Sequence, residues 1–300
     1  MGIGTAKELS FAIFGNTHQA AKSEAVSDVL SALRSTGAEV CVDKDYYGFL
    51  VRSGMLSERG VKVFEGDDFD VSFVISMGGD GTFLKAASRV GVKQTPIIGV
   101  NMGRLGFLAY IGRGEFGSWL RALAAGDYET DTREVIAVET DGEPFVGSNC
   151  ALNDVAILKR DNASMISVRT TIDGAYLTTY QADGLIISTP TGSTAYSLSN
   201  GGPIIVPGTH VFAITPVAAH SLNVRPIVIS DKSVLSMTVE SRNHNFLVAI
   251  DGRSEKCADT TCLTVRRAPY DVHIVKRVGS RYFDTLREKM MWGADTRSER

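Results

Sequence analysis

The fold of this chain is decided by residues 71–90, VSFVISMGGDGTFLKAASRV. Val71–Met77 is apolar, rich in β-branched residues and stopped by two glycines, which is typical of a buried strand. Thr82–Val90 carries apolar side chains at helical spacing. The two segments meet at Gly78-Gly79-Asp80-Gly81-Thr82, so the pattern predicts a strand that passes through a glycine-rich turn into a helix.

The chemistry of this turn favours a phosphate ligand. Gly78 and Gly79 follow a buried strand, where glycine lets the backbone approach a ligand closely. The helix that begins near Thr82 points its N-terminal N–H groups at the same place, and such groups attract phosphate. Asp80 can accept a proton or a hydrogen bond from a hydroxyl group. An ordinary turn remains the alternative, because Asp-Gly is common in turns.

The rest of the first 128 residues alternates between strands and helices. The pattern predicts strands at Phe11–Gly15, Glu39–Val42 and Pro96–Val100, and helices at Lys22–Thr36 and Glu115–Ala125. Strands that alternate with helices of this length imply a parallel sheet with helices on its faces. Residues 1–128 are therefore expected to form an α/β domain of the Rossmann-like type.

The pattern changes near Tyr128, where helical periodicity ends. Many short strands follow, separated by turn pairs such as Asp173-Gly174 and Asp251-Gly252. They predict a β-rich, sandwich-like domain at residues 129–270. Residues 271–300 are expected to form a last strand and an amphipathic helix. The strands expected in the β-rich domain are 134–139, 151–158, 164–172, 185–188, 211–216, 226–229, 233–241, 245–250 and 260–266.

Composition limits the class of protein. The chain has 300 residues, 44% of them hydrophobic, and its formal net charge of −3 disfavours a dedicated nucleic-acid binder. No apolar run approaches the ~20 residues that span a bilayer, and no signal-peptide pattern is present. Cys41, Cys150, Cys257 and Cys262 lack zinc-site spacing and are expected to be reduced thiols. We therefore expect a cytoplasmic protein with neither a nucleic-acid nor a membrane partner.

A second motif is the hydroxyl-rich segment Ser188–Ser199, STPTGSTAYSLS, which follows an expected strand. Hydroxyls and turn amides suit ribose and phosphate oxygens, and Tyr196 can stack on a base. An ordinary Ser/Thr-rich loop is the alternative, although Gly201-Gly202-Pro203 indicates more defined turn chemistry than a solvated loop needs. A weaker signal is Asn153-Asp154, because a strand interior disfavours both residues.

Three other patterns do not carry a function. Gly112–Gly117 matches G-x-G-x-x-G, but no clean strand precedes it, and we interpret it as a helix-entry loop. No Gly-Lys pair exists, so a Walker A loop is excluded. His220 has neither a nucleophile elbow nor placed triad partners.

The motifs together resemble the NAD kinase family. The glycine-rich turn alone is shared with diacylglycerol, sphingosine and phosphofructo-kinases, whereas Thr189–Pro203 is more particular to NAD kinases. The chain departs from the family at Ala219, where proline is frequent, and at Arg253, where glutamine is frequent. The matching segments are Gly78–Leu84, Asn101–Leu108, Leu152–Asp154, Ala182–Gly184, Ser188–Pro203 and His220–Pro226.

The resemblance implies transfer of the γ-phosphoryl group of ATP to the 2′-hydroxyl of the adenosine ribose of NAD, giving NADP. It implies that a divalent cation such as Mg²⁺ is bound through ATP rather than by protein ligands. It also implies that residues 271–300 return to the first domain. A homodimer or homotetramer is expected, with the active site between domains and subunits.

The resemblance also implies roles for individual residues. Asp80 matches the proton acceptor, Gly78, Gly79 and Thr82 match the phosphate turn, and Asp251 is a second candidate carboxylate. The residues expected to contact NAD are Asp80, Gly81, Phe83, Asn153, Asp154, Ser164, Gln181, Asp183, Thr194, Ala195, Tyr196, Ser197, Leu198, Ser199, Ala218 and Arg253.

Two alternatives stay open at this point. A lipid or sugar kinase could share the turn, but it would not require Thr189–Pro203. A catalytically silent dinucleotide-binding regulator is the other, although Asp80 is retained. The sequence leaves open whether polyphosphate replaces ATP and whether NADH is accepted.

Overall fold

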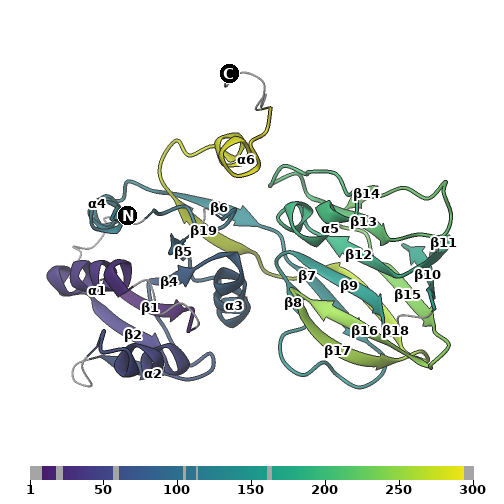
Figure 1. Ribbon diagram of the computed structural model, residues 1–300, viewed down its shortest axis with the longest axis horizontal. Coiled ribbons are helices and arrows are strands. Elements are labelled where there is room, and N and C mark those ends of the chain that lie inside the picture. The colour runs from purple at the N-terminus through teal and green to yellow at the C-terminus, as the bar shows by residue number, and fades with distance from the viewer. Residues whose placement is uncertain are drawn as a thin grey trace, which may run out of the picture. The chain divides into compact units, whose positions relative to one another are not determined.

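The computed structural model of the protein describes residues 9–17, 23–56, 61–103, 106–112, 114–160 and 164–293. The predictions that involve Lys22, Arg104, Leu105 or Arg113 lie in part outside these residues. The chain divides into two compact units (Figure 1). The first unit comes from residues 1–132 and 272–300, and the second from residues 133–271.

The first unit is built on a seven-stranded sheet of order β3-β2-β1-β4-β5-β19-β6. Every neighbouring pair from β3 to β19 is parallel. The pair β1–β4 is the point at which the strand order reverses, because β2 and β3 lie on one side of it and β5 on the other. The strands are β1 (Ser10–Gly15), β2 (Glu39–Asp43), β3 (Lys62–Phe64), β4 (Phe73–Gly78), β5 (Ile97–Asn101), β6 (Glu129–Arg133) and β19 (Val272–Lys276).

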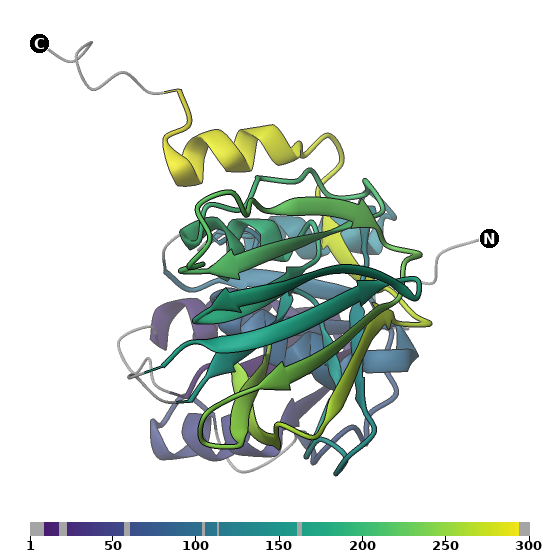
Figure 2. The same cartoon turned by 90° about the vertical axis from the view of Figure 1, so that its right-hand side faces the viewer.

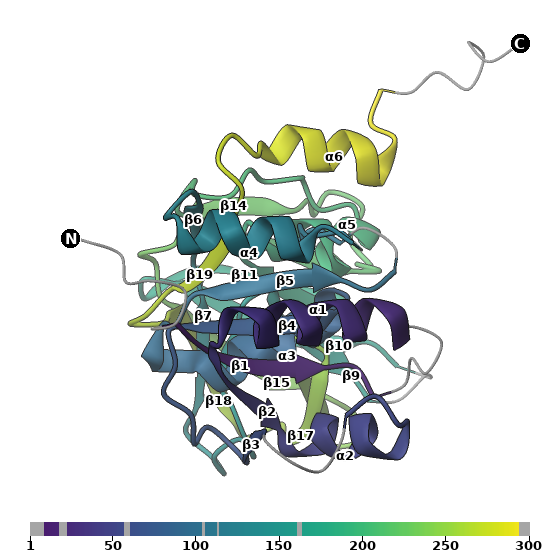
Figure 3. The ribbon, with the colours of Figure 1, turned by 90° about the vertical axis from the view of Figure 1, so that its left-hand side faces the viewer.

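Helices cover both faces of this sheet. Helices α1 and α4 lie on one face and α3 on the other (Figures 1 and 3). Val29 and Leu33 of α1 pack with Phe11 and Ile13 of β1 and with Trp119 of α4 in one buried cluster. The helices are α1 (Ser23–Thr36), α2 (Lys44–Arg52), α3 (Asp80–Val90), α4 (Phe116–Ala124) and α6 (Tyr282–Met290), with a 3-10 turn η3 at Gly91–Lys93.

The second unit is a sandwich of two six-stranded sheets whose paired strands are antiparallel (Figure 2). One sheet has the order β11-β10-β15-β18-β7-β8, and the other β14-β13-β12-β9-β16-β17. Alternate side chains of both sheets, such as Val168, Ile187 and Phe246, fill one buried core.

The elements of the second unit are as follows. The first sheet contains β7 (Ile136–Thr140), β8 (Cys150–Ala151), β10 (Ile166–Ile172), β11 (Ala175–Ala182), β15 (Leu235–Glu240) and β18 (Cys262–Arg267). The second contains β9 (Asp154–Lys159), β12 (Gly184–Ser188), β13 (Val211–Val217), β14 (Ile227–Ser230), β16 (Asn245–Ile250) and β17 (Arg253–Ala258). Two short helical turns, η4 (Gly192–Thr194) and α5 (Tyr196–Ser199), follow β12.

The predicted fold class is confirmed, and the strands that sequence reasoning missed share a physical cause. Strands β3, β6, β11 and β17 are edge strands, and β6, β11 and β17 carry polar residues on both faces. Without apolar alternation they give no strand signal. Helix α2 was also missed, because its core contacts come from Tyr46 and Leu50 within an otherwise polar, glycine-containing segment.

Two predictions about class can be compared with the described residues. All four cysteines are free thiols. Among the helices that the structure describes, none combines the length and the apolar character that crossing a membrane requires.

Candidate functional site

The glycine-rich turn joins β4 to α3 and leaves space on one side. A Cβ at Gly78 would lie 2.2 Å from Thr82 Oγ1, so this glycine is required by the turn itself. A Cβ at Gly79 or Gly81 would meet no protein atom within 4 Å. Both of these glycines line a cavity, so their missing side chains leave room for a ligand rather than for the fold.

This cavity has a volume of about 1130 Å³ and lies where the carboxyl ends of β1 and β4 meet. Open α/β sheets bind ligands at such a reversal of strand order. Three cationic side chains, Lys44, Arg52 and Lys85, line it together with the turn. Lys85 Nζ lies 3.8 Å from carboxylate oxygens of Asp43 and Asp45. Lys44 Nζ lies 2.7 Å from Glu65 Oε2. The cavity therefore combines open glycine backbone with cationic side chains, two of which are paired with carboxylates, and both features suit a phosphate-bearing ligand.

The carboxylate of Asp80, the first residue of α3, is held by the segment that follows β5. The backbone N–H of Phe107 donates to Oδ2 at 3.0 Å, and that of Leu108 donates to Oδ1 at 3.1 Å. Gly106 permits this approach, because a Cβ there would lie 2.1 Å from Asp80 Oδ1. The Asp80 side chain is still 30% exposed, so it remains accessible to a ligand.

A third donor reaches Asp80 from helix α6. Lys289 Nζ donates to Asp80 Oδ2 at 3.1 Å and lies 4.2 Å from the centre of the Phe107 ring. Sequence reasoning did not single out Lys289, because a lysine in the last turn of an amphipathic helix carries no distinguishing pattern. It also assigned no role to Gly106–Leu108, although these residues end a segment that resembles the family.

In the second unit, the predicted pair Asn153-Asp154 forms a tightly held turn at the start of β9. The carboxylate of Asp251 accepts the N–H groups of Leu152 at 2.8 Å, Asn153 at 2.8 Å and Asp154 at 3.1 Å. The hydroxyl of Thr189 donates to the carbonyl oxygen of Leu152 at 2.6 Å. Asp251 is therefore a clamp for this turn in the structure.

Burial raises the pKa of both acids at this turn. It raises the pKa of Asp154 to about 7, and the nearby charge of Asp251 acts in the same direction. Burial also raises the pKa of Asp251, while the three amides that it accepts lower it. Since those amides stabilise an anion, we assign the negative charge of the pair to Asp251 and the proton to Asp154.

The segment 188–199 uses much of its hydroxyl content for its own structure. Ser193 Oγ donates to the Pro190 carbonyl oxygen at 2.6 Å, and Ser197 Oγ lies 2.9 Å from Thr215 Oγ1. Both serine side chains are fully buried. Tyr196 is 40% exposed, so its side chain is the one of this segment best placed to stack on a ligand.

The other predicted contacts to NAD lie at the opposite end of β12. Asp183 precedes β12, and its carboxylate lies 2.7 Å from Lys159 Nζ. Ser164 and Gln181 line a second cavity of about 780 Å³. Ala218 follows β13 with a φ of +46°. The structure thus places the predicted residues of the second unit in two groups, one at each end of β12.

Two predicted residues have side chains occupied by the fold. Phe83 is fully buried, so only its backbone is available to a ligand. The guanidinium of Arg253 donates to the carbonyl oxygens of Val146 and Ser148 and pairs with Glu255. Arg253, at which the chain departs from the family, therefore holds the loop before β8 in place.

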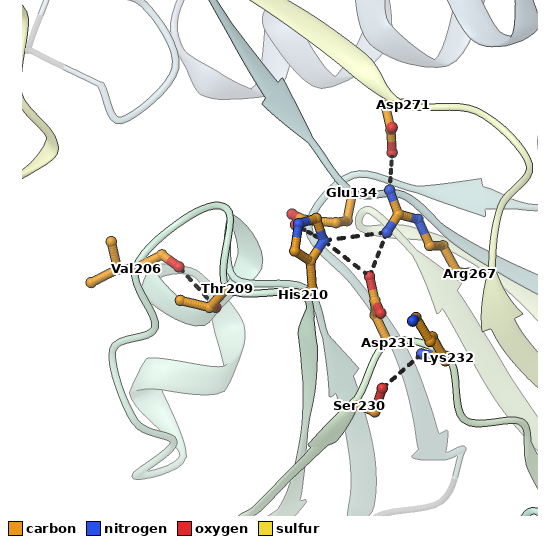
Figure 4. A network of polar contacts seen from close by, with 9 residues as sticks. All are labelled: Glu134, Val206, Thr209, His210, Ser230, Asp231, Lys232, Arg267 and Asp271. Atoms are coloured by element: carbon orange, nitrogen blue, oxygen red, sulfur yellow. Dashed lines mark hydrogen bonds and ion pairs between the residues drawn. The ribbon is translucent and has the colours of Figure 1, made fainter.

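Figure 4 shows a polar cluster elsewhere in the second unit. His210 Nδ1 lies 3.1 Å from Glu134 Oε1 and 3.4 Å from Asp231 Oδ2. Among the described residues, these three form the one group with ligand atoms close enough for a metal ion, within 4.8 Å of one another. Arg267 already donates to Asp231 Oδ2 at 2.5 Å and to Asp271 Oδ1 at 2.7 Å. Because a guanidinium supplies the positive charge, we assign the cluster to the fold.

The fold and the turn define an enzyme class that handles nucleotide phosphates. Comparison with known proteins gives the family. Residues 11–128 match the family model for the ATP-NAD kinase N-terminal domain, and residues 152–277 match that for the ATP-NAD kinase C-terminal domain. An NAD kinase of Bacteroides fragilis is 56% identical over 289 residues, which cover 96% of this chain and 100% of the relative. An NAD kinase of Porphyromonas gingivalis is 38% identical over 286 residues, covering 95% and 99%. This chain belongs to the ATP-NAD kinase family.

Solved structures agree on the fold. Yeast NADH kinase complexed with NADH has a TM-score of 0.87 at 21% identity, over 97% of this chain and 90% of that chain. An NAD kinase from Archaeoglobus fulgidus in complex with ATP has a TM-score of 0.71 at 24% identity, over 94% and 99%. With the family assigned, the predicted activity, phosphorylation of NAD with ATP, is confirmed, and a lipid or sugar kinase is not favoured.

Proposed function

We propose that Asp80 accepts a hydrogen bond from the 2′-hydroxyl of the adenosine ribose of NAD and orients this hydroxyl toward the γ-phosphorus of ATP. Transfer of the phosphoryl group then gives NADP and ADP. The observation that carries this proposal is the held carboxylate: two backbone amides fix Asp80, yet its side chain stays 30% exposed. Its sequence neighbours Gly79 and Gly81 line the cation-rich cavity of the first unit.

The mechanism follows from the acidity of the groups involved. Phosphoryl transfer has a loose transition state, so catalysis consists mainly of aligning the nucleophile and offsetting charge. A ribose hydroxyl is far less acidic than a carboxylic acid, so its complete deprotonation before attack is strongly unfavourable. The proton therefore moves late, and the main task of Asp80 is to orient the hydroxyl.

The cavity of the first unit is the proposed place for the triphosphate of ATP. Its open glycines, the first turn of α3 and Lys44, Arg52 and Lys85 offer amides and cations to phosphate oxygens. The two carboxylates of the lining, Asp45 and Glu65, already pair with Lys85 and Lys44, so the cavity fits a divalent cation carried by the nucleotide rather than one held by protein ligands. A bound Mg²⁺ would supply positive charge that offsets the charge of the phosphates.

The residues of the second unit are proposed to hold the dinucleotide. Asn153 and Tyr196 belong to the group at one end of β12, and Asp183 and Ala218 to the group at the other. Five extended residues separate the groups by about 17 Å. We propose that the chain is a homo-oligomer in which the second group contacts NAD bound to a neighbouring copy. The free, partly buried thiols support a cytoplasmic location, where cysteines stay reduced.

One assay tests the activity. The chain is incubated with Mg²⁺, ATP and NAD, and NADP is read with an NADP-specific dehydrogenase. The wild-type chain should form NADP, and Asp80→Asn should lose at least ~100-fold in kcat while still binding NAD. Near-normal turnover of Asp80→Asn would remove Asp80 from the mechanism.

A mixing experiment tests the shared site. Asp80→Asn and Asp183→Ala chains are co-expressed with different affinity tags, and the mixed oligomer is isolated. If neighbouring copies complete each other's sites, the mixed oligomer should exceed the activity of either parent. Equal inactivity of the mixed and parent oligomers would contradict the shared site.

A further inference from the structure

The contact between Lys289 and Asp80 joins two residues separated by 209 positions in the sequence. Lys289 stands in the last turn of α6, and α6 is anchored through buried Thr285 and Leu286. Its ammonium lies 3.1 Å from the carboxylate of Asp80 and 4.2 Å from the centre of the Phe107 ring. The lysine side chain is 27% exposed, so its charged end is held rather than free in solvent.

Phe107 contacts both Asp80 and Lys289, the first through its backbone and the second through its ring. Its own backbone N–H donates to Asp80 Oδ2, which is the same oxygen that accepts Lys289. The ring of Tyr282, at the start of α6, lies 6.4 Å from the Phe107 ring. Helix α6 therefore contacts the segment that fixes Asp80 at both of its ends.

The count of acceptor sites shows what the ammonium does. An ionised carboxylate offers about four lone-pair sites, two on each oxygen. Oδ2 accepts hydrogen bonds from the backbone N–H of Phe107 and from the ammonium of Lys289, and Oδ1 accepts one from the backbone N–H of Leu108. With the ammonium in place, the open site lies on Oδ1. Without it, each oxygen has one open site, and a hydroxyl can bind in two orientations.

The ammonium also affects the donor substrate. A carboxylate that accepts the ribose hydroxyl lies close to the phosphoryl group being transferred, and two negative groups repel each other. Among the described residues, Lys289 carries the positive charge nearest to this carboxylate, at 3.1 Å. It lowers the repulsion at the place where the phosphoryl group must approach.

We propose that Lys289 is a positioning residue for the kinase reaction: it directs the 2′-hydroxyl to Oδ1 of Asp80 and offsets the charge of that carboxylate. The C-terminal helix is thereby part of the catalytic arrangement. This proposal rests on the proposed role of Asp80. It concerns orientation in the transition state, so it predicts a change in kcat rather than in substrate affinity.

The test compares Lys289→Met with Lys289→Arg in the full-length chain. Methionine keeps an unbranched, apolar stem against Phe107 and removes only the charge, so the fold should be retained. We expect Lys289→Met to lower kcat by ~10- to 100-fold, with the KM for NAD within ~3-fold of wild type. Lys289→Arg should keep most of the wild-type kcat, because it keeps the positive charge. Arg287→Met is the matched control, because Arg287 lies on the same helix and pairs with Asp284.

The outcomes separate this proposal from the proposed function. If the wild-type chain forms no NADP, the proposed function fails. If the wild type is active and Lys289→Met has an unchanged kcat, only the role of Lys289 fails. The role also fails if Lys289→Arg is as impaired as Lys289→Met, or if Arg287→Met loses as much activity. A parallel thermal melt of each variant shows whether a loss of kcat reflects unfolding, which would also overturn the positioning role.

Discussion

The substitution Gly106→Ala should displace the Asp80 carboxylate, the proposed acceptor, without touching a substrate directly. A Cβ at position 106 would lie 2.1 Å from Asp80 Oδ1, whereas real Cβ atoms essentially never come closer than 3.0 Å to such an atom. Either the carboxylate or the segment 106–108 must therefore move by at least about 0.9 Å. Both amide hydrogen bonds to Asp80 depend on the present spacing.

A displacement of this size has a predictable kinetic cost. A 1 Å misplacement of a reacting group lowers the rate by ~100-fold, so kcat for NADP formation should fall by about that factor. The KM for NAD should change much less, because the residues of the second unit are unaltered. The assay is the dehydrogenase-coupled reaction at saturating ATP, with a thermal melt of each variant.

The control is Gly117→Ala, at a helical glycine where a Cβ would meet nothing within 4 Å. It should keep full activity and gain slight stability, because alanine is the better helix former. If Gly106→Ala turned over within ~3-fold of wild type, the amide fork would not be what fixes Asp80.

Two further predictions concern the cavity and the buried acids. Gly81→Ala should not lower the melting temperature and should raise the KM for ATP by ~10-fold or more, because Gly81 lines the cavity and a Cβ there would meet no protein atom; a normal KM would place the triphosphate elsewhere. Asp154→Asn should reduce the loss of stability between pH 5 and pH 8, measured by urea unfolding. Burial raises the pKa of Asp154 to about 7, so its contribution is present at low pH and is lost as the pH rises from about 4 through 7. At pH 8 the asparagine variant should be the more stable by up to about 4 kcal/mol, and an unchanged slope would contradict the raised pKa.

The sequence was sufficient for the fold class because the decisive signals are local. The apolar run before Gly78 and the helical pattern after Gly81 lie within twenty residues, and they give β4, the turn and α3 within a few residues. The elements that failed are those whose signal is not local. Edge strand β11 carries polar residues on both faces and takes its conformation from pairing with β10.

The candidate site could be predicted only in part, for the same reason. Asp80 stood out because it sits in the turn, whereas Lys289 is brought to it by a contact that spans 209 residues. The hydroxyl-rich segment was identified as a ligand loop from composition. Composition could not show that Ser193 and Ser197 direct their hydroxyls inward, since that depends on partners at Pro190 and Thr215.

The two carboxylates that the sequence put forward can now be told apart by the donors around them. Asp251 accepts three backbone amides and lies in a buried setting, with no cation among its hydrogen-bond donors. An anion satisfied in this way stabilises a turn and has little reason to attract a hydroxyl. Asp80 accepts two amides and an ammonium and keeps a 30% exposed side chain beside the cavity-lining glycines. Its donors fix its orientation and still leave an acceptor site open, which is the requirement for a residue that orients a nucleophile. The geometry therefore favours Asp80 as the acceptor and gives Asp251 the task of holding Asn153 and Asp154 in place.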